Sequence, residues 1–114
     1  DTMVGVIHFR SDSLYTFDGD TAWQHPQLEN RLLTRKGPFL GLAVVEGRLL
    51  ANYNRKFTWI GKPENGFMEV ISRKKHGFIY TNGYLLIATQ YDSVRPFAYG
   101  HAAVMIKGKW GYVD

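Results

Sequence analysis

The sequence predicts an all-β fold built from antiparallel hairpin repeats. Twelve glycines accompany an aromatic content of 15%, a combination that suits strands and tight turns better than helices. The chain also repeats its own pattern at a spacing of 34 residues, which indicates that one structural unit is used more than once. Its 114 residues suffice for a single domain with one core. The strands of such a domain could form a meander, an open sheet or a small barrel.

The first part of the chain, residues 1–37, is a divergent N-terminal unit. Two runs rich in β-branched and aromatic residues predict strands at residues 4–9 and 14–17. The Asp-Gly-Asp sequence at residues 18–20 then predicts a turn. This unit is therefore expected to be β-rich, although it lacks a clear copy of the repeat.

The same unit allows one short helix near residues 26–33. Pro26 stands where proline commonly begins a helix. Leu28 and Leu32 are four residues apart, so they would share one face of that helix. The pattern favours neither presence nor absence of the helix.

Residues 38–65 form an eroded copy of the repeat. The stretch "GPFLGLAVV" echoes Pro96, Phe97 and the residues from Gly100 to Val104. The stretch "RLLANY" continues it as a further strand. The second half of this copy has no tryptophan or glycine in phase with the later copies.

The last part of the chain, residues 66–114, holds two copies that align without a gap. "MEVISRKKHGFIY", from Met68 to Tyr80, matches "AAVMIKGKWGYVD", from Ala102 to Asp114. Each copy consists of two β-prone runs around a basic turn, so each predicts a hairpin. Asn-Gly pairs at residues 65–66 and 82–83 predict the turns that link these hairpins to neighbouring strands.

The second of these copies resembles the WG repeat of bacterial proteins, also called KWG, through its closing Lys-Trp-Gly-Tyr-Val-Asp. The resemblance is clear over residues 66–114, weak over 38–65 and absent for 1–37. The first copy departs from the pattern, because His76 stands in place of the tryptophan and Tyr80 in place of the final aspartate. The resemblance implies a β-rich repeat protein of bacterial origin that is used for binding, and it supplies no catalytic residues. The residues that carry the structural signature are Gly77, Phe78, Tyr91, Asp92, Phe97, Gly100, Trp110, Gly111 and Tyr112.

The residue types of this signature have a structural explanation. Alternate residues of a strand share a face, so Trp110 and Tyr112 should point one way and Gly111 the other. A glycine inside a strand commonly marks the close approach of another backbone, so Gly77 and Gly111 are expected where neighbouring units stack. Trp110 is expected in the core, because a buried indole removes a large apolar area from water. Asp92 is expected to have a structural role in a turn.

The basic hairpin turns are the candidate binding surface. Residues 31–114 carry thirteen basic and five acidic side chains. Hairpins stacked in register would align the cations of their turns as a ridge that could bind phosphates or an acidic protein surface. Lysines at turns and strand edges also keep sheets from pairing with other chains, and this plainer interpretation is favoured. The residues of this basic ridge are Arg73, Lys74, Lys75, Lys107 and Lys109.

No constellation of catalytic or metal-binding residues stands out in the sequence. The four histidines show no spacing typical of a metal site and the chain has no cysteine, so no metal ion or cofactor is predicted. Neither a glycine-rich phosphate loop nor a Gly-x-Ser-x-Gly motif is present. A hydrolase that combines His8 or His25 with Asp18 or Asp20 is the weakest alternative.

The sequence therefore favours a non-enzymatic module that binds another protein through its repeats. The alternative from a different class is a module that binds nucleic acid or another polyanion along the basic ridge. No apolar stretch of the sequence is long enough to span a membrane. The chain starts at Asp1 and has its first methionine at Met3, so we expect a processed chain or a piece of a longer one. Its oligomeric state and its location, cytoplasmic or exported, are left open by the sequence.

Overall fold

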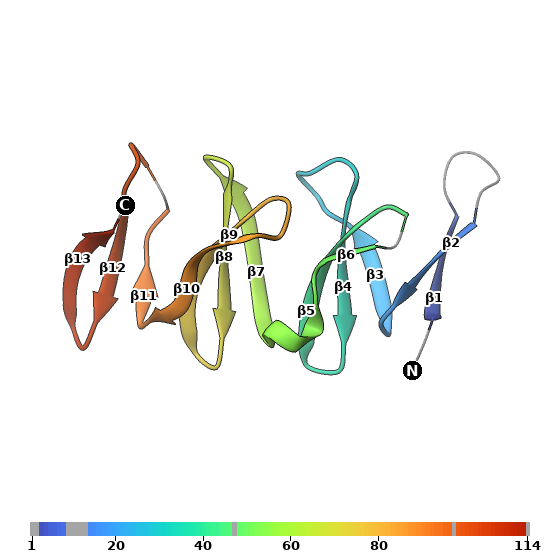
Figure 1. The fold of residues 1–114 in the computed structure, drawn as a ribbon, viewed down its shortest axis with the longest axis horizontal. Helices are drawn as coiled ribbons and strands as arrows, with labels where there is room; N and C mark the ends of the chain where they lie inside the picture. The colour runs from blue at the N-terminus through green and yellow to red at the C-terminus, as the bar shows by residue number, and fades with distance from the viewer. Residues whose placement is uncertain (1–2, 9–13, 47, 97, 114) are drawn as a thin grey trace. The chain divides into compact units, whose positions relative to one another are not determined.

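The computed structural model describes residues 3–8, 14–46, 48–96 and 98–113. Nearly all of this chain is β-structure and every pair of neighbouring strands is antiparallel, so the predicted fold class is confirmed (Figure 1). The chain divides into two compact units, Asp1–Lys56 and Phe57–Asp114, called unit 1 and unit 2 below.

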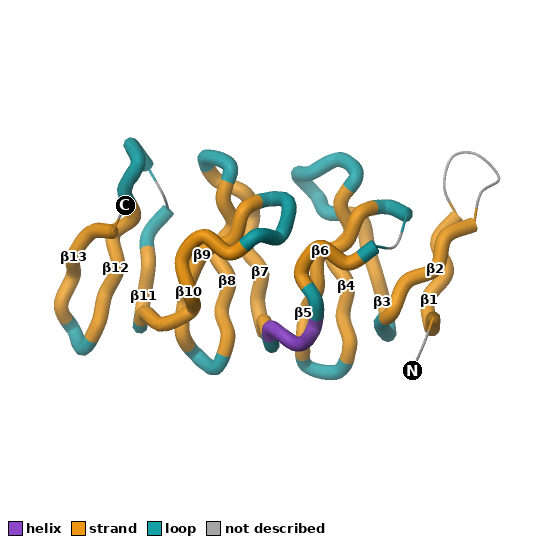
Figure 2. The backbone as a smooth tube through the Cα atoms, in the orientation of Figure 1, coloured by secondary structure: helices purple, strands orange, loops and turns teal. Residues whose placement is uncertain are grey.

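Unit 1 contains the strands β1 (Met3–His8), β2 (Leu14–Asp18), β3 (Thr21–Gln24), β4 (Arg31–Lys36), β5 (Phe39–Val44) and β6 (Leu49–Ala51), and the short 3-10 helix η1 (Tyr53–Arg55). The strands form two sheets. One consists of β1 and β2, and the other has the order β3-β4-β5-β6. Figure 2 shows η1 as the short helical segment after β6.

Unit 2 contains the strands β7 (Phe57–Glu64), β8 (Phe67–Ser72), β9 (Lys75–Tyr80), β10 (Leu85–Tyr91), β11 (Ser93–Val94), β12 (Ala102–Ile106) and β13 (Lys109–Val113). One sheet has the order β10-β9-β8-β7 and the other the order β11-β12-β13. Among the described strands no sheet closes on itself, so the meander and open sheet are found and the small-barrel alternative is wrong.

The short helix that the sequence allowed near residues 26–33 is not formed. Turns follow β3, and β4 already begins at Arg31. Asn30 has a φ of 60°, a left-handed conformation that cannot continue a right-handed helix.

His25 explains why a turn is formed there instead. The side chain is buried, and its Nδ1 accepts hydrogen bonds from the amides of Gln27 at 3.0 Å and Leu28 at 3.2 Å. The amide of His25 donates to the Arg31 carbonyl at 2.9 Å. These bonds satisfy the backbone locally and bring β3 back beside β4.

The interior of unit 1 lies on its four-stranded sheet. Leu42 and Ala43 of β5 are fully buried. The hydroxyl of Tyr53 donates to the Asp18 carbonyl and is also hydrogen-bonded to the hydroxyl of Thr34 at 2.8 Å. Burial raises the pKa of Tyr53. The buried Thr34 hydroxyl is therefore satisfied by a partner brought in by η1.

The interior of unit 2 joins its two sheets. Phe78 and Ile87 of the first sheet pack with Val94, Ala102 and Val104 of the second. Full burial of a Val, Ile or Phe side chain contributes about 1.5–3 kcal/mol, so this cluster is a main source of cohesion between the two hairpins. Neighbouring repeats in unit 2 are thus held together by a shared core.

The 34-residue repeat of the sequence is a repeat of strand pairing in unit 2. Val70 faces Gly77 across β8 and β9, and Val104 faces Gly111 across β12 and β13. Each of the later two residues follows its counterpart by 34 positions. The gapless alignment of the two copies is therefore also their structural alignment.

The hairpin of unit 1 is a further copy in a register that the sequence alignment did not find. Strands β4 and β5 have the same lengths as β8 and β9 and precede them by 36 residues. Gly41 consequently corresponds to Gly77, and not to Gly100 as the sequence suggested. Leu40 occupies the position that the tryptophan has in the last copy. The residue that would have shown the correct alignment in the sequence is therefore absent from this copy.

The two basic hairpin turns share one backbone conformation. Arg73 and Lys74 have φ values of 53° and 68°, and Lys107 and Gly108 have values of 52° and 80°. Positive φ at both central residues is the pattern of the type I′ turn, which matches the twist of the flanking strands. Lys74 adopts with a Cβ the conformation that Gly108 adopts without one.

Candidate functional site

One continuous segment connects the two sheets of unit 2. Its first part is β10, which pairs with β9, and its last part is β11, which pairs with β12 (Figure 1). Asp92 lies between these strands, where one carboxylate oxygen forms an ion pair with Lys75 and the other accepts a hydrogen bond from the Lys107 amide at 2.8 Å. The hydrogen bond from Lys75, followed by that from the Lys107 amide, lowers the pKa of Asp92. Asp92 therefore links the turn of one hairpin to the turn of the next.

Unit 1 uses a related arrangement at its own hairpin turn. An oxygen of Asp20 accepts a hydrogen bond from the Gly37 amide at 2.8 Å. Asp18 forms an ion pair of 3.0 Å with Lys36. Both carboxylates of the Asp-Gly-Asp sequence are thus engaged with the turn between β4 and β5.

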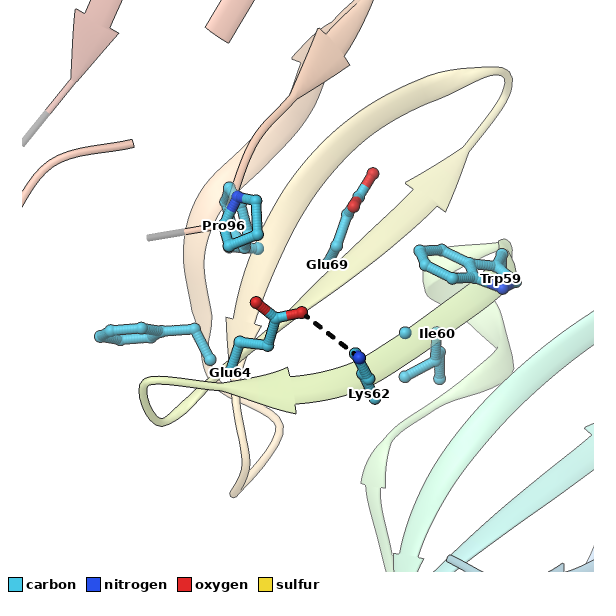
Figure 3. A pocket seen from close by; sticks show the side chains of 9 residues that line it. Trp59, Ile60, Lys62, Glu64, Glu69 and Pro96 are labelled. Atoms are coloured by element: carbon cyan, nitrogen blue, oxygen red, sulfur yellow. Dashed lines mark ion pairs between the residues drawn. The ribbon is translucent and has the colours of Figure 1, made fainter. Parts of the chain in front are cut away.

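A pocket of about 370 Å³ lies beside β7 and β8 in unit 2 and is called the β7–β8 pocket below (Figure 3). Trp59 and Pro96 stand on opposite sides of it, with Glu64 and Glu69 between them (Figure 3). Trp59 is 44% exposed, and its ring lies so close to Gly61 that a Cβ there would be 2.6 Å from a ring carbon. Because Gly61 has no side chain, the indole ring of Trp59 can lie against its backbone.

The charged residues that line the β7–β8 pocket are the two carboxylates of Glu64 and Glu69 and the ammonium group of Lys62. The carboxylate of Glu69 is in hydrogen-bond contact with Nδ1 of His76 on the neighbouring strand. Glu64 lies 3.9 Å from the ammonium group of Lys62, and an exposed pair at this distance is weak. The pocket thus combines apolar walls with an acidic group that is only loosely paired.

The last hairpin of unit 2 presents its aromatic side chains to solvent. Trp110 is 47% exposed, so the expectation that it lies in the core is wrong. The guanidinium group of Arg95 lies 4.9 Å from the centre of its ring, in reach of a cation–π interaction. Trp110, Gly111 and Tyr112 line a smaller hollow of about 240 Å³.

The stretch from Gly77 in β9 to Trp110 in β13 spans the connecting segment and part of both hairpins. Residues 77–110 match the family model of the WG containing repeat. The resemblance predicted from the sequence is thus confirmed, and these residues form a repeat module. Comparisons with curated proteins and with solved structures gave no match. Within the described residues, no helix has the length and apolar composition to cross a membrane.

The signature residues of the WG repeat occupy several different environments. Phe78 lies in the core shared by the two sheets, and Tyr91 packs against that core while partly exposed. Gly100 has a φ of 79° in the turn before β12, where its lack of a Cβ removes the strain. Phe97 lies outside the described residues.

The two signature glycines of unit 2 differ in their surroundings. A Cβ on Gly77 would collide with the carbonyl oxygen of Ile87 and lie 2.8 Å from the carbonyl carbon of Ala88. A Cβ on Gly111 would meet nothing within 4 Å among the residues described. Among the described residues, the close backbone approach expected at both positions is therefore found at Gly77 and not at Gly111.

The residues of the predicted basic ridge gather at one end of unit 2. Figure 1 shows the turn between β8 and β9 and the turn between β12 and β13 at the same end of this unit. Asp92 contacts both turns and neutralises Lys75. The other ridge residues are exposed: Arg73, Lys74, Lys107 and Lys109. Their role in binding stays a prediction.

The histidines considered in the sequence serve the fold where their side chains are described. His25 holds the turn before β4, and His76 pairs with Glu69. His101 is exposed before β12, and nothing is described for the side chain of His8. Within the described ranges no group of three potential metal ligands gathers, and the expectation that no metal or cofactor is bound stays a prediction.

The sequence analysis did not single out Trp59, Gly61 or Pro96. A tryptophan followed two positions later by a glycine was an available signal, because residues two apart on a strand share a face and the ring can lie across the glycine. Pro96 offered no such signal, since it reaches the β7–β8 pocket from the segment after β11. Only the tertiary structure brings it there.

Proposed function

We propose that unit 2 is a non-catalytic module for protein–protein recognition, and that the β7–β8 pocket holds a short segment of the partner. The observation that carries this proposal is the half-exposed Trp59 opposite Pro96 in a pocket of about 370 Å³. Such a volume lies at the lower end of the range of pockets that bind small ligands or single side chains. Exposed tryptophans in pockets are also the residues that most often dominate binding energy at protein interfaces.

The lining indicates what the bound segment carries. Trp59 and Pro96 offer apolar surface to a large apolar side chain. Glu64 is loosely paired and can accept a lysine or arginine beside that side chain. The pocket therefore suits a segment in which an apolar residue stands next to a cation.

A non-catalytic role is supported by the chemistry of the same lining. None of the residues that line the pocket is a serine, threonine or cysteine, so the described lining offers none of these nucleophiles. The carboxylate of Glu69 is held by His76 in a contact between neighbouring strands. The match to a repeat family points in the same direction.

The proposal is tested by selecting a displayed library of random linear peptides against the immobilised full chain. Enriched peptides should pair an apolar residue with lysine or arginine. Trp59→Ala should weaken their binding at least tenfold, the loss expected when an aromatic anchor is truncated. Glu64→Gln should weaken it less, with a smaller difference at high salt, because salt screens exposed charges.

Trp23→Ala is the matched control, since Trp23 is a comparably exposed tryptophan of unit 1. It should leave peptide binding unchanged. Equal binding of the peptides to Trp59→Ala and to the wild type would contradict the proposal. The polyanion alternative would replace it if the chain instead bound a single-stranded DNA oligomer with steep salt dependence, and if combined alanine substitution of Arg73, Lys74, Lys107 and Lys109 abolished that binding.

A further inference from the structure

The β7–β8 pocket runs along β7, and its two ends differ in chemistry. At one end the ring of Trp59 lies against Gly61. At the other end Glu64 faces Phe67 across the turn between β7 and β8, and both residues line the pocket. The ring of Phe67 packs against that of Tyr80, with 5.2 Å between the ring centres. The pocket therefore has an indole at one end and, at the other, a carboxylate beside a pair of aromatic rings.

The spacing of these two ends favours one backbone conformation for a bound segment. Gly61 and Glu64 are three residues apart on β7, or about 8–10 Å, because a β-bulge between Ile60 and Pro63 shortens the strand locally. Side chains three positions apart on a polyproline II helix share a face and lie about 9 Å apart. Side chains on one face of an extended strand lie about 7 or 13 Å apart. A polyproline II helix therefore fits this spacing better than a strand does.

An α-helix fits the pocket less well than polyproline II. It needs about seven residues, or two turns, to place two side chains about 10 Å apart on one face, and it is itself about 10–12 Å wide. A pocket of about 370 Å³ has the size for single side chains and not for such a cylinder. Polyproline II spans the same distance with three residues and a narrower backbone.

The lining of the pocket also suits the surface of a polyproline II helix. Proline rings are apolar and rigid, and they dock onto aromatic side chains such as Trp59 and Phe67. The carbonyl groups of this helix are free to accept, because it has no internal hydrogen bonds. Within the described residues the indole N–H of Trp59 has no hydrogen-bond partner, so it can donate to one of these carbonyls.

The charge beside Phe67 indicates that the segment carries one basic residue. Glu64 is exposed, and its contact with Lys62 is a weak one at 3.9 Å. A guanidinium group forms two parallel hydrogen bonds with a carboxylate, which a distant ammonium group does not. An arginine of the partner can therefore displace Lys62 from Glu64.

We propose that the β7–β8 pocket binds a proline-rich segment in the polyproline II conformation, with a proline on Trp59 and an arginine three positions away at Glu64. This inference rests on the proposed function, because it names the class of partner for the same pocket. Binding of such segments in aromatic-lined grooves is a known mode of peptide recognition. A segment that is already ordered before it binds loses little conformational entropy, which favours affinity.

The test compares three synthetic peptides of equal length and charge, each titrated into the full chain. The first has five prolines followed by an arginine, and the second has the arginine before the prolines, so both chain directions are covered. In the third, a leucine stands three positions before the arginine and serines replace the other prolines. This leucine peptide keeps the apolar residue and the cation without the polyproline II conformation. Calorimetry gives the affinities, and the NMR signal of the Trp59 indole N–H reports where the peptide binds.

We expect at least one proline peptide to bind at least tenfold more tightly than the leucine peptide and to shift the Trp59 indole signal. Trp59→Ala should weaken this binding at least tenfold, and Glu64→Gln several-fold. Lys62→Gln should strengthen it, because it removes the cation that competes for Glu64. Trp23→Ala is the matched control and should leave it unchanged, and all four variants should keep the melting temperature of the wild type.

A leucine peptide that binds as tightly as the proline peptides and depends on Trp59 would overturn this inference and leave the proposed function intact. Failure of both proline peptides to bind at millimolar concentration would also overturn it. If the random peptide library then yields no enriched sequence either, the proposed function fails as well. Binding of the proline peptides that is unchanged in Trp59→Ala or in Glu64→Gln would likewise contradict the inference, because those peptides would then occupy another surface.

Discussion

Lys74 occupies a backbone conformation that favours glycine. Its φ of 68° lies in the left-handed region, which costs a residue with a Cβ about 1–2 kcal/mol. We expect Lys74→Gly to raise the free energy of unfolding by about 1 kcal/mol, because the greater freedom of glycine in the unfolded chain offsets part of the gain. Urea denaturation of the full chain measures this difference.

Lys74→Ala is the matched control for that substitution. It removes the ammonium group and keeps the Cβ, so the free energy of unfolding should stay within about 0.5 kcal/mol of the wild type. An equal increase in both variants would show that charge repulsion, rather than backbone strain, limits the stability of this turn.

We expect the stability of unit 1 to depend on pH through His25. Burial lowers the pKa of His25 below its ordinary value of 6.5, and its Nδ1 accepts two backbone hydrogen bonds that only an unprotonated nitrogen can accept. The unfolded chain therefore binds the proton more readily than the folded one. The stabilisation is fully present above about pH 6.5 and is lost as the pH falls from there through the folded-state pKa.

His25→Asn isolates this contribution, because its side-chain oxygen can accept the same amide hydrogen bonds and does not titrate in this range. We expect the free energy of unfolding to fall more steeply between pH 7.5 and pH 5 in the wild type than in His25→Asn. Denaturation curves at the two pH values provide the comparison. Parallel losses in both proteins would mean that other groups carry the acid sensitivity.

Single residues also mark the limit of sequence reasoning. Asp92 was expected to have a structural role in a turn, and it does bind the Lys107 amide in one. Its second partner, Lys75, could not be foreseen, because the contact joins residues from two different hairpins. Trp110 was expected in a core, but its ring lies on the surface beside Arg95 since no described element covers β13.

At the scale of elements, the hairpins were predictable because their signals are local. Alternating β-prone residues around two-residue turns predict the hairpin of β8 and β9 and the hairpin of β12 and β13. The helix that the sequence left open near residues 26–33 is absent for a related reason. The apolar spacing there fits a helix, whereas the side chain of His25 satisfies the local amides in a turn that the spacing does not reveal.

The Asn-Gly turn at residues 82–83 predicted a strand after it, but the sequence did not predict that the segment formed by β10 and β11 joins two sheets. It pairs with the hairpin before it through β10 and with the hairpin after it through β11, so its register depends on two hairpins at once. The structure also shows that the hairpin of unit 1 is a copy of the repeat. Its strands β4 and β5 have the same bounds relative to each other as β8 and β9, although this copy has no tryptophan in the signature position. Strand pairing is conserved between these copies where side chains are not.

At the scale of the whole molecule, the β7–β8 pocket lies where neighbouring repeats of unit 2 meet. The β7–β8 pocket takes Glu69 from one hairpin and Pro96 from the segment that leads into the next. A repeat protein gains such surfaces by stacking units, since each junction brings together residues from two copies. The sequence could predict the repeat, but the lining of a junction depends on packing between copies.

The central claim at this scale is that a repeat is a hairpin whose glycine is crossed by the strand after it, as Gly41 and Gly77 are in the described chain. The most direct measurement is the free energy of unfolding of Gly77→Ala and Gly111→Ala in the full chain, determined by urea denaturation. We predict that Gly77→Ala loses about 1–3 kcal/mol, the usual cost of overpacking, because its Cβ would meet the backbone of β10. Gly111→Ala should be unchanged or up to about 1 kcal/mol more stable, because nothing in the described chain crosses it and alanine limits the unfolded chain more than glycine does. Equal effects at the two glycines would contradict the account.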